Sequence, residues 1–395
     1  MTKVLLTNCK PPPDGSSCFF CNEKRQPLGL GYISACLKRE GIEVDFVDNY
    51  AEPRDMREYI LETKPDFVGI YVNSICWQEF LKMFETIRDL DVKFVCGGPH
   101  CTLMPNSLPY DVDYVVIGEG EMAMVDIAKG KVNTRIVCYP HIKDINELPD
   151  PDYTIFEGIR YWERMEFLED KPVMPLNTSR GCPMGCNFCG VSHIWGNTYR
   201  FLSADKIIGQ IKHLMKAYGT RSFYMREDNF TFNRERVEEF CEKAKPLGIE
   251  FVCESRIDNL DKELLEKMKE SGCKGLYVGT ESGNDRVLKM LNKNITVEMI
   301  REKVNLIRSL GIKVMASWLI NSPGEEESEI EETFALSKEL GCEINNHNVF
   351  AGMPLSNFYN DLLKSGDYEK IDDCFIIRPR RYSEYARKIY GFAPS

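Results

Sequence analysis

The chain has no long apolar run, no cleavable leader and no excess of basic residues. No stretch approaches the roughly 20 apolar residues that a membrane span needs, so we expect none. Residues 1–6 are typical of a β-strand and not of a signal peptide, which predicts a cytoplasmic protein. A net charge of −11 argues against a nucleic-acid partner, because such proteins usually display a basic face. The 395 residues instead suggest a globular protein of two or three domains.

Cysteine, by contrast, is abundant. Sixteen cysteines in a reducing compartment indicate metal or redox chemistry, because disulfides are disfavoured there. Cys182, Cys186 and Cys189 have CxxxCxxC spacing, which offers three thiolates to a four-iron cluster and leaves its fourth iron without a protein ligand. Zinc is the alternative, but zinc sites usually take four protein ligands, commonly from CxxC pairs. The spacing therefore favours an iron–sulfur cluster with one open iron.

The segment 179–189, with Phe188 just before the last cysteine, resembles the signature of radical S-adenosylmethionine (SAM) enzymes. This resemblance implies that SAM binds the open iron through its amino and carboxylate groups. Reduction then cleaves SAM, and the resulting 5′-deoxyadenosyl radical abstracts hydrogen from a small-molecule substrate. The resemblance also implies an electron donor such as flavodoxin or ferredoxin.

Residues 1–140 alternate strand and helix patterns, which predicts a doubly wound, Rossmann-like α/β domain. Such a sheet binds its ligand at the carboxyl ends of its strands. Glycine-rich loops at those ends would let the backbone approach a bulky ligand. The expected strands are 4–7, 44–47, 67–72, 94–95 and 114–117.

This half resembles the cobalamin-binding domain of B12-dependent radical SAM enzymes, through residues 27–30, 97–100 and 118–121. The resemblance covers most of residues 1–125. No Asp-x-His-x-x-Gly segment occurs, so the histidine that ligates cobalt in many B12 proteins is missing, as it commonly is in radical SAM methylases of this class. His100 is a candidate cobalt ligand, with a hydrogen-bonded loop histidine as the alternative. The implied cobalamin contacts are Gly97, Gly98, His100, Gly118 and Glu119.

Other cysteines favour a competing interpretation. Cys9, Cys76 and either Cys96 or Cys101 lie at expected strand ends and could hold a second cluster. That arrangement loosely resembles the methylthiotransferases, which carry an auxiliary cluster as a sulfur source. The acidic charge and the lack of a basic C-terminal domain count against it. Cys18 and Cys21 form a further CxxC pair in a Pro/Gly/Ser-rich loop, which favours an ordered loop or a redox-sensitive thiol pair.

The second half resumes the βα alternation after a proline-containing connector at 141–172. Six expected strands fit a partial (β/α)6 TIM-like barrel over 173–350, in which chemistry gathers at the carboxyl ends of the strands. The cysteine segment follows the first of them, as that rule requires. Residues 351–395 are expected to form a short C-terminal cap. The expected strands are 173–177, 222–225, 251–253, 275–278, 314–319 and 343–349.

Several residues behind these strands match the SAM-binding positions of the family. Glu227 and Asp228 offer carboxylates for the amino group of SAM. Arg256 suits the SAM carboxylate, because a planar guanidinium pairs with two oxygens. By the same resemblance, Glu281 binds the ribose and Ser322 lies in the turn that contacts adenine.

Together these features predict a cobalamin-dependent radical SAM methyltransferase that acts on an unactivated carbon of a small-molecule biosynthetic intermediate. Three alternatives stay open at this point. One is a cobalamin-free radical SAM enzyme that catalyses a rearrangement, cyclisation or oxidation. The second is sulfur insertion with an auxiliary cluster. The third is a non-catalytic cobalamin or redox sensor, which would have no need of the SAM-contacting residues.

Overall fold

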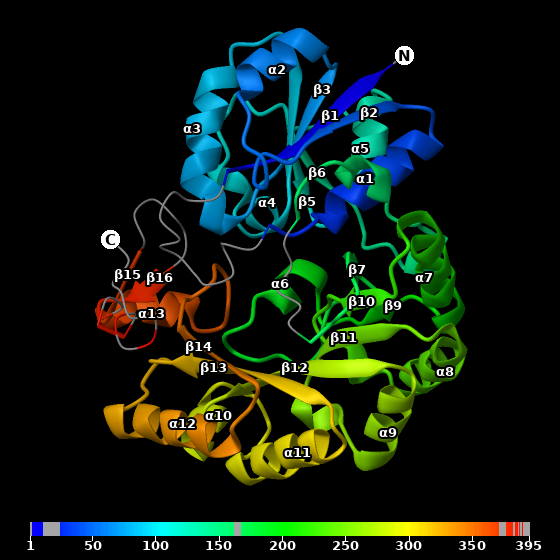
Figure 1. Cartoon of the computed structure of the whole chain (residues 1–395). Helices are drawn as coiled ribbons and strands as arrows, with labels where there is room; N and C mark the ends of the chain where they lie inside the picture. Colours follow the sequence, from blue (N-terminus) through cyan, green and yellow to red (C-terminus); the bar gives the residue numbers. More distant parts are fainter. Residues whose placement is uncertain are drawn as a thin grey trace. The chain divides into compact units, whose positions relative to one another are not determined.

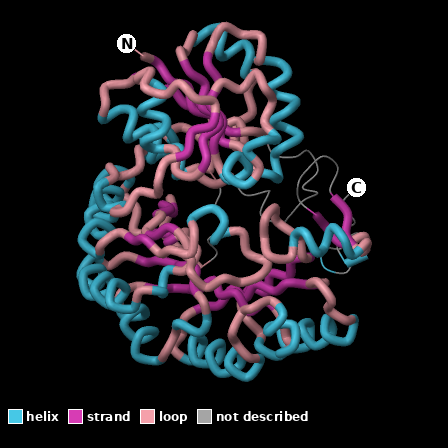
Figure 2. Tube along the Cα trace, turned by 180° about the vertical axis from the view of Figure 1, so that it is seen from behind, coloured by secondary structure: helices cyan, strands magenta, loops and turns pink. Residues whose placement is uncertain are grey.

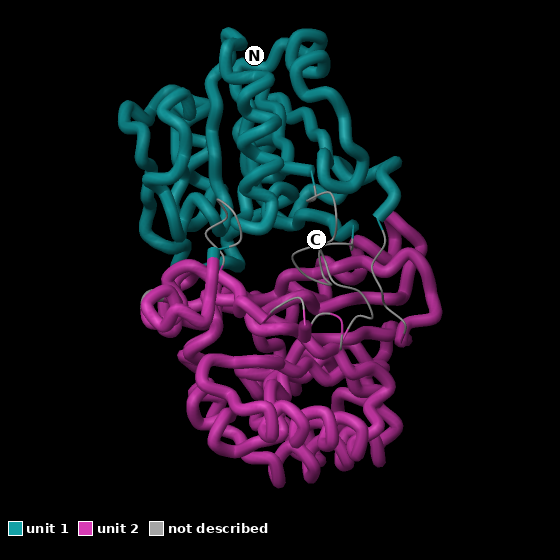
Figure 3. Tube along the Cα trace, turned by 90° about the vertical axis from the view of Figure 1, so that its left-hand side faces the viewer, with its two compact units in different colours: residues 1–163, 370–376, 394–395 teal, residues 164–369, 377–393 magenta. Residues whose placement is uncertain are grey.

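The fold is described from a computed structural model at residues 2–10, 24–161, 167–370, 377–381, 384, 385, 387 and 389. The chain divides into two compact units (Figure 3). Unit 1 is formed mainly by Met1–Glu163, and unit 2 by Arg164–Glu369 and Ile377–Ala393. The domain limits expected at residues 140, 172 and 350 stay predictions.

Unit 1 is built on a six-stranded parallel sheet in the order β2-β1-β3-β4-β5-β6. This topology confirms the doubly wound fold expected from the alternating pattern. Because β1 lies between β2 and β3, the strand order reverses there, and doubly wound sheets bind ligands at such a switch point. The strands are β1 Lys3–Asn8, β2 Glu43–Val47, β3 Phe67–Tyr71, β4 Lys93–Gly97, β5 Tyr114–Ile117 and β6 Ile136–Cys138.

Helices lie on both faces of this sheet (Figure 1). Helix α1 (Leu28–Arg39) packs against α5 (Glu121–Ala128), and α2 (Met56–Thr63) packs against α3 (Trp77–Ile87). The buried residues of α3 recur at helical spacing and join a hydrophobic core with β3 and β4. The short helix α4 (Pro99–Leu103) follows directly after β4. These layers leave the carboxyl ends of the strands as the place where loops gather.

Unit 2 is a parallel sheet of six strands with helices on its outer side (Figure 2). Its order, β14-β13-β12-β11-β10-β7, confirms the partial barrel. The side chains of Ser203, Asp261 and Thr296 cap α7, α9 and α11, so polar residues fix where these helices begin. The strands are β7 Val173–Leu176, β10 Ser222–Met225, β11 Glu250–Ser255, β12 Cys273–Glu281, β13 Lys313–Ile320 and β14 Ile344–Val349; the helices are α7 Ala204–Tyr218, α8 Arg234–Ala244, α9 Lys262–Glu270, α10 Asp285–Met290, α11 Val297–Ser309 and α12 Glu327–Leu340.

The barrel has one apolar end. Phe167 and Leu168 pack there against Tyr224 of β10 and Val252 of β11. The opposite, carboxyl ends of the strands carry the charged residues that the sequence singled out. The sheet therefore presents its polar groups at the edge where barrels of this type carry out chemistry. Among the described residues, no helix is long and apolar enough to cross a membrane.

Candidate active site

The cluster loop, residues 181–190, starts from a two-residue strand. β8 (Ser179–Arg180) pairs antiparallel with β9 (Arg200–Phe201). Gly181 opens the loop with φ +91°, and a Cβ atom there would lie 2.3 Å from the carbonyl oxygen of Thr198. Only glycine fits this close approach. This strand pair thus fixes the start of the loop that carries the three cysteines.

The three cysteines of this loop are partly exposed, whereas most other described cysteines are buried. Burial raises the pKa of Cys182 and raises that of Cys189 to about 12, and the nearby Asp228 carboxylate raises both further. These two thiols are therefore protonated at neutral pH until a bound metal removes their protons. An open loop that presents three thiols fits the donor set of an iron–sulfur cluster.

A single metal ion fits less well. Over the described part of the chain, no three His, Cys, Asp or Glu side chains stand in a geometry that could hold one. A zinc ion needs its ligands within about 2.0–2.3 Å, whereas a four-iron cluster is larger and its ligands stand further apart. Three thiolates without a fourth protein ligand suit a cluster with one open iron better than a structural zinc site, which usually takes four protein ligands.

A segment that the sequence did not single out holds the loop in place. We call residues 290–293, the last residue of α10 and the three that follow it, the collar. Asn187 donates its backbone N–H to Leu291 O at 3.0 Å and its Nδ2 to Met290 O at 2.8 Å. Asn292 donates Nδ2 to Gly185 O at 2.7 Å. Three hydrogen bonds thus bind the collar to the cluster loop.

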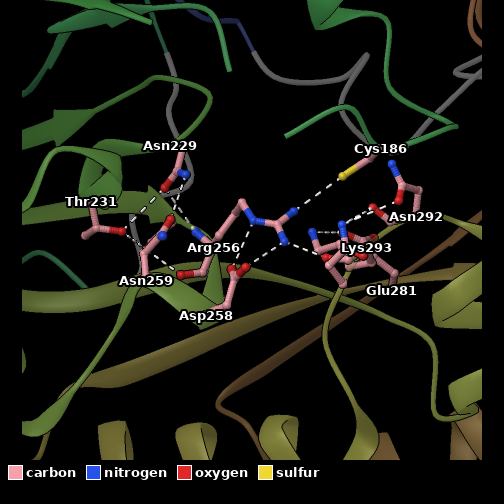
Figure 4. A network of polar contacts seen from close by, with 11 residues as sticks. Cys186, Asn229, Thr231, Arg256, Asp258, Asn259, Glu281, Asn292 and Lys293 are labelled. Carbon is pink, nitrogen blue, oxygen red and sulfur yellow. Dashed lines mark hydrogen bonds and ion pairs between the residues drawn. The ribbon is translucent and has the colours of Figure 1, made fainter. Parts of the chain in front are cut away.

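Arg256 lies between the cluster loop and the collar (Figure 4). Asp258 accepts from its Nε at 3.0 Å and from its Nη2 at 2.9 Å. Nη2 also donates to Lys293 O at 2.5 Å, and Nη1 donates to Cys186 Sγ at 3.3 Å. The two-oxygen partner of this guanidinium is therefore Asp258, and the expected two-oxygen pairing with the SAM carboxylate would have to displace it. A contact between Arg256 and SAM stays a prediction.

Glu281 forms a buried ion pair with Lys293, a collar residue. Lys293 Nζ lies 2.7 Å from Glu281 Oε1, and both side chains are 7% exposed. Glu281 ends β12 in the left-handed region, with φ +63°. Because each charge neutralises the other, both can stay buried at the strand ends. The expected ribose contact of Glu281 is untested by this geometry.

The structure separates the two carboxylates expected at the amino group of SAM. Glu227 is buried and accepts hydrogen bonds from Thr178 and Ser179, and Arg236 Nη2 lies 3.7 Å from its Oε2. Asp228 is an exposed residue, although partial burial of its carboxyl group raises its pKa. It also lies close enough to Cys182 and Cys189 to raise their pKa values. The contacts of both carboxylates with SAM stay predictions.

Ser322 and Phe188 have different surroundings. Ser322 is 1% exposed, and within the described residues its Oγ has no hydrogen-bond partner. A buried hydroxyl without a partner is costly, so a ligand at this turn would gain by bonding it. Its backbone N–H is held by Glu325 Oε2 at 2.7 Å. Phe188 instead packs against an apolar cluster that includes Phe350 and Tyr359, which anchors the cluster loop.

In unit 1, His100 is fully buried. Its Nδ1 lies 2.9 Å from Ser74 Oγ, its Nε2 lies 2.9 Å from Ser107 Oγ, and its ring stacks on Trp77. Both ring nitrogens are therefore engaged, which argues against the cobalt-ligand interpretation. The loop-histidine alternative fits better, although the partners here are serine hydroxyls and not backbone.

We expect His100→Ala to leave the visible spectrum of bound cobalamin unchanged and to lower the free energy of unfolding by about 3 kcal/mol, because it leaves a cavity and unpaired hydroxyls. Burial lowers the pKa of His100 to about 4, against about 6.5 in an unfolded chain. Its stabilising effect is present above pH 6.5 and is lost as pH falls toward 4. Urea unfolding across this pH range should show that the free energy of unfolding falls less in the variant than in the unmodified protein. An altered cobalt spectrum would contradict this assignment.

The other expected cobalamin contacts also bond within the unit. Gly98 has φ +105°, and a Cβ there would lie 2.8 Å from Val72 O, so its own sheet requires glycine. Gly118 N donates to Thr102 Oγ1 at 3.0 Å, which joins the loops after β4 and β5. Glu119 Oε2 accepts from Ile142 N at 2.7 Å. A Cβ atom added at Gly97 would meet no atom closer than an ordinary packing distance. Their contacts with cobalamin stay predictions.

The unit 1 cysteines do converge, but inside the hydrophobic core. Cys9, Cys76, Cys96 and Cys101 are each at most 2% exposed and belong to one core cluster. Burial raises the pKa of Cys9 well above its usual value, and Cys76 and Cys101 raise it further. This weighs against an auxiliary cluster there; Cys18 and Cys21 lie outside the described residues.

Sequence reasoning missed Asp258, Asn292 and Lys293. Asn292 and Asn294 have φ +54° and +58°, a conformation that asparagine tolerates better than most residues. The run Asn-Lys-Asn after a short helix was therefore a local sign of a tight, ordered turn. Nothing in the sequence showed that this turn would meet residues 185–187, about a hundred positions away.

Two family models match the chain. The radical SAM superfamily model matches residues 176–337, and the B12 binding domain model matches residues 23–128. The first covers most of the barrel with the cysteine loop, and the second covers unit 1 from α1 to α5, with strands β2 to β5. The chain is a radical SAM enzyme with a B12-binding domain. Its cofactors are accordingly a [4Fe-4S] cluster, SAM and cobalamin.

Named relatives and solved structures agree with this assignment. An uncharacterized methyltransferase of Pyrococcus horikoshii is 27% identical, over 98% of this chain and 91% of that protein. The anaerobic magnesium-protoporphyrin IX monomethyl ester cyclase of Rubrivivax gelatinosus is 26% identical, over 87% of this chain and 68% of that protein. The radical SAM methyltransferase TsrM of Kitasatospora setae, solved with cobalamin and a [4Fe-4S] cluster, has the same fold: TM-score 0.72, 18% identity, 96% of this chain and 83% of that chain.

Proposed function

We propose that the chain is a methyltransferase that uses cobalamin as methyl carrier and acts on an unactivated carbon of a small-molecule biosynthetic intermediate. The observation that carries this proposal is the loop of three partly exposed cysteines, fastened at the strand ends of a partial barrel in a chain that also has a B12-binding domain. When bound, the cluster and SAM would supply the hydrogen-abstracting radical, and cobalamin would supply the methyl group. Relatives named as methyltransferases support the transfer.

The residues of unit 2 would have separate roles in binding the cluster and SAM. Cys182, Cys186 and Cys189 would hold the cluster. Asp228 would accept a hydrogen bond from the amino group of SAM. It is exposed beside this loop, whereas Glu227 is enclosed by other hydrogen-bond partners. Ser322 would bond SAM through its unpaired hydroxyl. An electron donor such as flavodoxin or ferredoxin would reduce the cluster.

In unit 1, the loops after β4 and β5 would contact cobalamin, at the carboxyl ends of the parallel strands. Gly97 and Gly118 would give the backbone room for a large ring. The lower face of cobalt would carry no histidine from His100, because both nitrogens of that ring are engaged with serine hydroxyls. This distinguishes the expected cobalt environment from that of B12 proteins with a ligating histidine.

Metal and corrin analysis of a single anaerobically reconstituted sample tests the proposal. We expect roughly one corrin and about four irons per chain. Incubation with SAM, reductant and candidate substrates should then give 5′-deoxyadenosine together with S-adenosylhomocysteine. About eight irons without corrin would favour the auxiliary-cluster alternative, and about four irons without corrin would overturn methyl transfer through cobalamin.

A second candidate is supported by the relative from Rubrivivax gelatinosus, which is named a cyclase. A radical SAM enzyme of that kind would close a ring and transfer no methyl group. The same incubation separates the two candidates, since a cyclase would form 5′-deoxyadenosine without S-adenosylhomocysteine. Isotope-labelled SAM would show whether its methyl carbon reaches the product.

A further inference from the structure

Of the contacts at the cluster loop, one sets Cys186 apart from the other two cysteines. A guanidinium nitrogen, Arg256 Nη1, donates a hydrogen bond to its sulfur at 3.3 Å (Figure 4). The side chain of Arg256 is 6% exposed. Hydrogen bonds that reach a cluster sulfur from a site shielded from water help to set the reduction potential of the cluster.

The guanidinium cannot easily turn away from this sulfur. Asp258 binds its Nε and Nη2 with both carboxylate oxygens, and Lys293 O accepts from Nη2. The backbone N–H of Arg256 is held by Asn229 Oδ1 at 3.3 Å. A planar group that is held by three hydrogen bonds at Nε and Nη2 has one orientation left for its remaining nitrogen. The direction of Nη1 toward Cys186 is thus set by the surrounding structure.

The collar connects this arginine to the rest of the cluster loop. Lys293 offers its carbonyl to Arg256, while its ammonium group is neutralised by Glu281. The preceding residue, Asn292, binds Gly185 O in the cluster loop. One short segment therefore fixes both the arginine and the backbone next to Cys186. This coupling requires the collar to keep its conformation.

We infer that Arg256 is a positioning residue that orients Cys186 and raises the reduction potential of the cluster by placing a positive charge and a hydrogen bond on one cluster sulfur. The inference rests on the proposed cluster at Cys182, Cys186 and Cys189. Reduction adds one electron from an external donor to the cluster, and a nearby cation stabilises the added negative charge. Arg256 thereby makes the cluster easier to reduce.

The test is a redox titration of the reconstituted protein, in which electron paramagnetic resonance monitors the reduced cluster. We expect Arg256→Gln to shift the midpoint potential to a more negative value, and Arg256→Lys, which keeps the charge but loses the fork, to shift it less. Arg301→Gln is the matched control, because Arg301 also binds a carboxylate through Nε and Nη2, that of Glu339, but lies on α11, away from the cluster loop. The control should keep the midpoint of the unmodified protein.

The outcomes separate this inference from the proposed function. An unchanged midpoint in Arg256→Gln with full iron content would overturn the tuning role. If Arg256→Gln binds no iron, Arg256→Lys decides: a more negative midpoint supports the inference, and an unchanged midpoint, or loss of iron here too, overturns it in favour of a scaffolding role. Absence of a four-iron cluster from the unmodified protein would instead overturn the proposed function.

Discussion

Replacement of Cys182, Cys186 and Cys189 together with alanine should abolish iron binding and SAM cleavage. The cluster loop would then offer no thiolate, and thiolates are what hold such clusters. Iron content should fall from about four atoms per chain to near zero, and 5′-deoxyadenosine should fall below detection. Chemical iron analysis and chromatography of the reaction mixture measure the two effects.

The fold of this variant should persist, because the three side chains are partly exposed and the loop backbone is still held by the collar. Circular dichroism and the urea midpoint would verify this. The control is Cys138→Ala, which removes an exposed thiol at the end of β6 and should change neither iron content nor SAM cleavage. Retention of SAM cleavage by the triple variant would refute the cluster assignment.

Arg236→Leu should lower the free energy of unfolding of unit 2 by about 3–5 kcal/mol, because it leaves a buried carboxylate without its cation. Arg236 and Glu227 have side chains that are 2% and 0% exposed. Arg236 also donates from Nη1 to Thr178 O at 3.0 Å and from Nη2 to Phe230 O at 2.8 Å. Burial already raises the pKa of Glu227, and loss of the Arg236 cation should raise it further. Urea unfolding at several pH values measures both effects.

A neighbouring arginine on the same helix provides the control. Arg234 pairs with Glu238 and Asp261 at the surface, with 39% of its side chain exposed, so Arg234→Leu should cost no more than about 1 kcal/mol. The double variant Glu227→Gln with Arg236→Met should recover much of the loss, because it removes both charges. Equal costs for the two single arginine variants would show that the buried pair contributes little.

Local patterns predicted the strands well, because strands that are buried on both faces of a parallel sheet are short continuous apolar runs, as in β1 and β10. The strand expected over 222–225 has the same bounds in β10, and the strand expected over 44–47 is β2, Glu43–Val47. The elements without a clear period were missed. β6 has three residues and α10 six, which is too short for a repeat to show.

The candidate site could be predicted only in part. The cysteine spacing alone located the cluster loop, and the strand ends located Asp228, Arg256 and Glu281. What these residues bond to could not be read from the chain. Asp258 lies two positions from Arg256 and was still missed, since proximity in sequence does not show which way a side chain points.

The sequence by itself determined which chemical groups are available. It places three thiols at the spacing of a cluster ligand set, directly after the first strand of a βα repeat, and it adds a second βα domain with glycine-rich loops. Such features depend on spacing and periodicity, which are local. Only the tertiary structure decided that Glu227 is enclosed while Asp228 is exposed and that His100 has no free ring nitrogen. It also decided that Asn292 binds the cluster loop and that Lys293 binds Arg256. These outcomes depend on which distant backbone and side-chain groups meet when the strands align, and burial then fixes the hydrogen-bond partner of each polar atom.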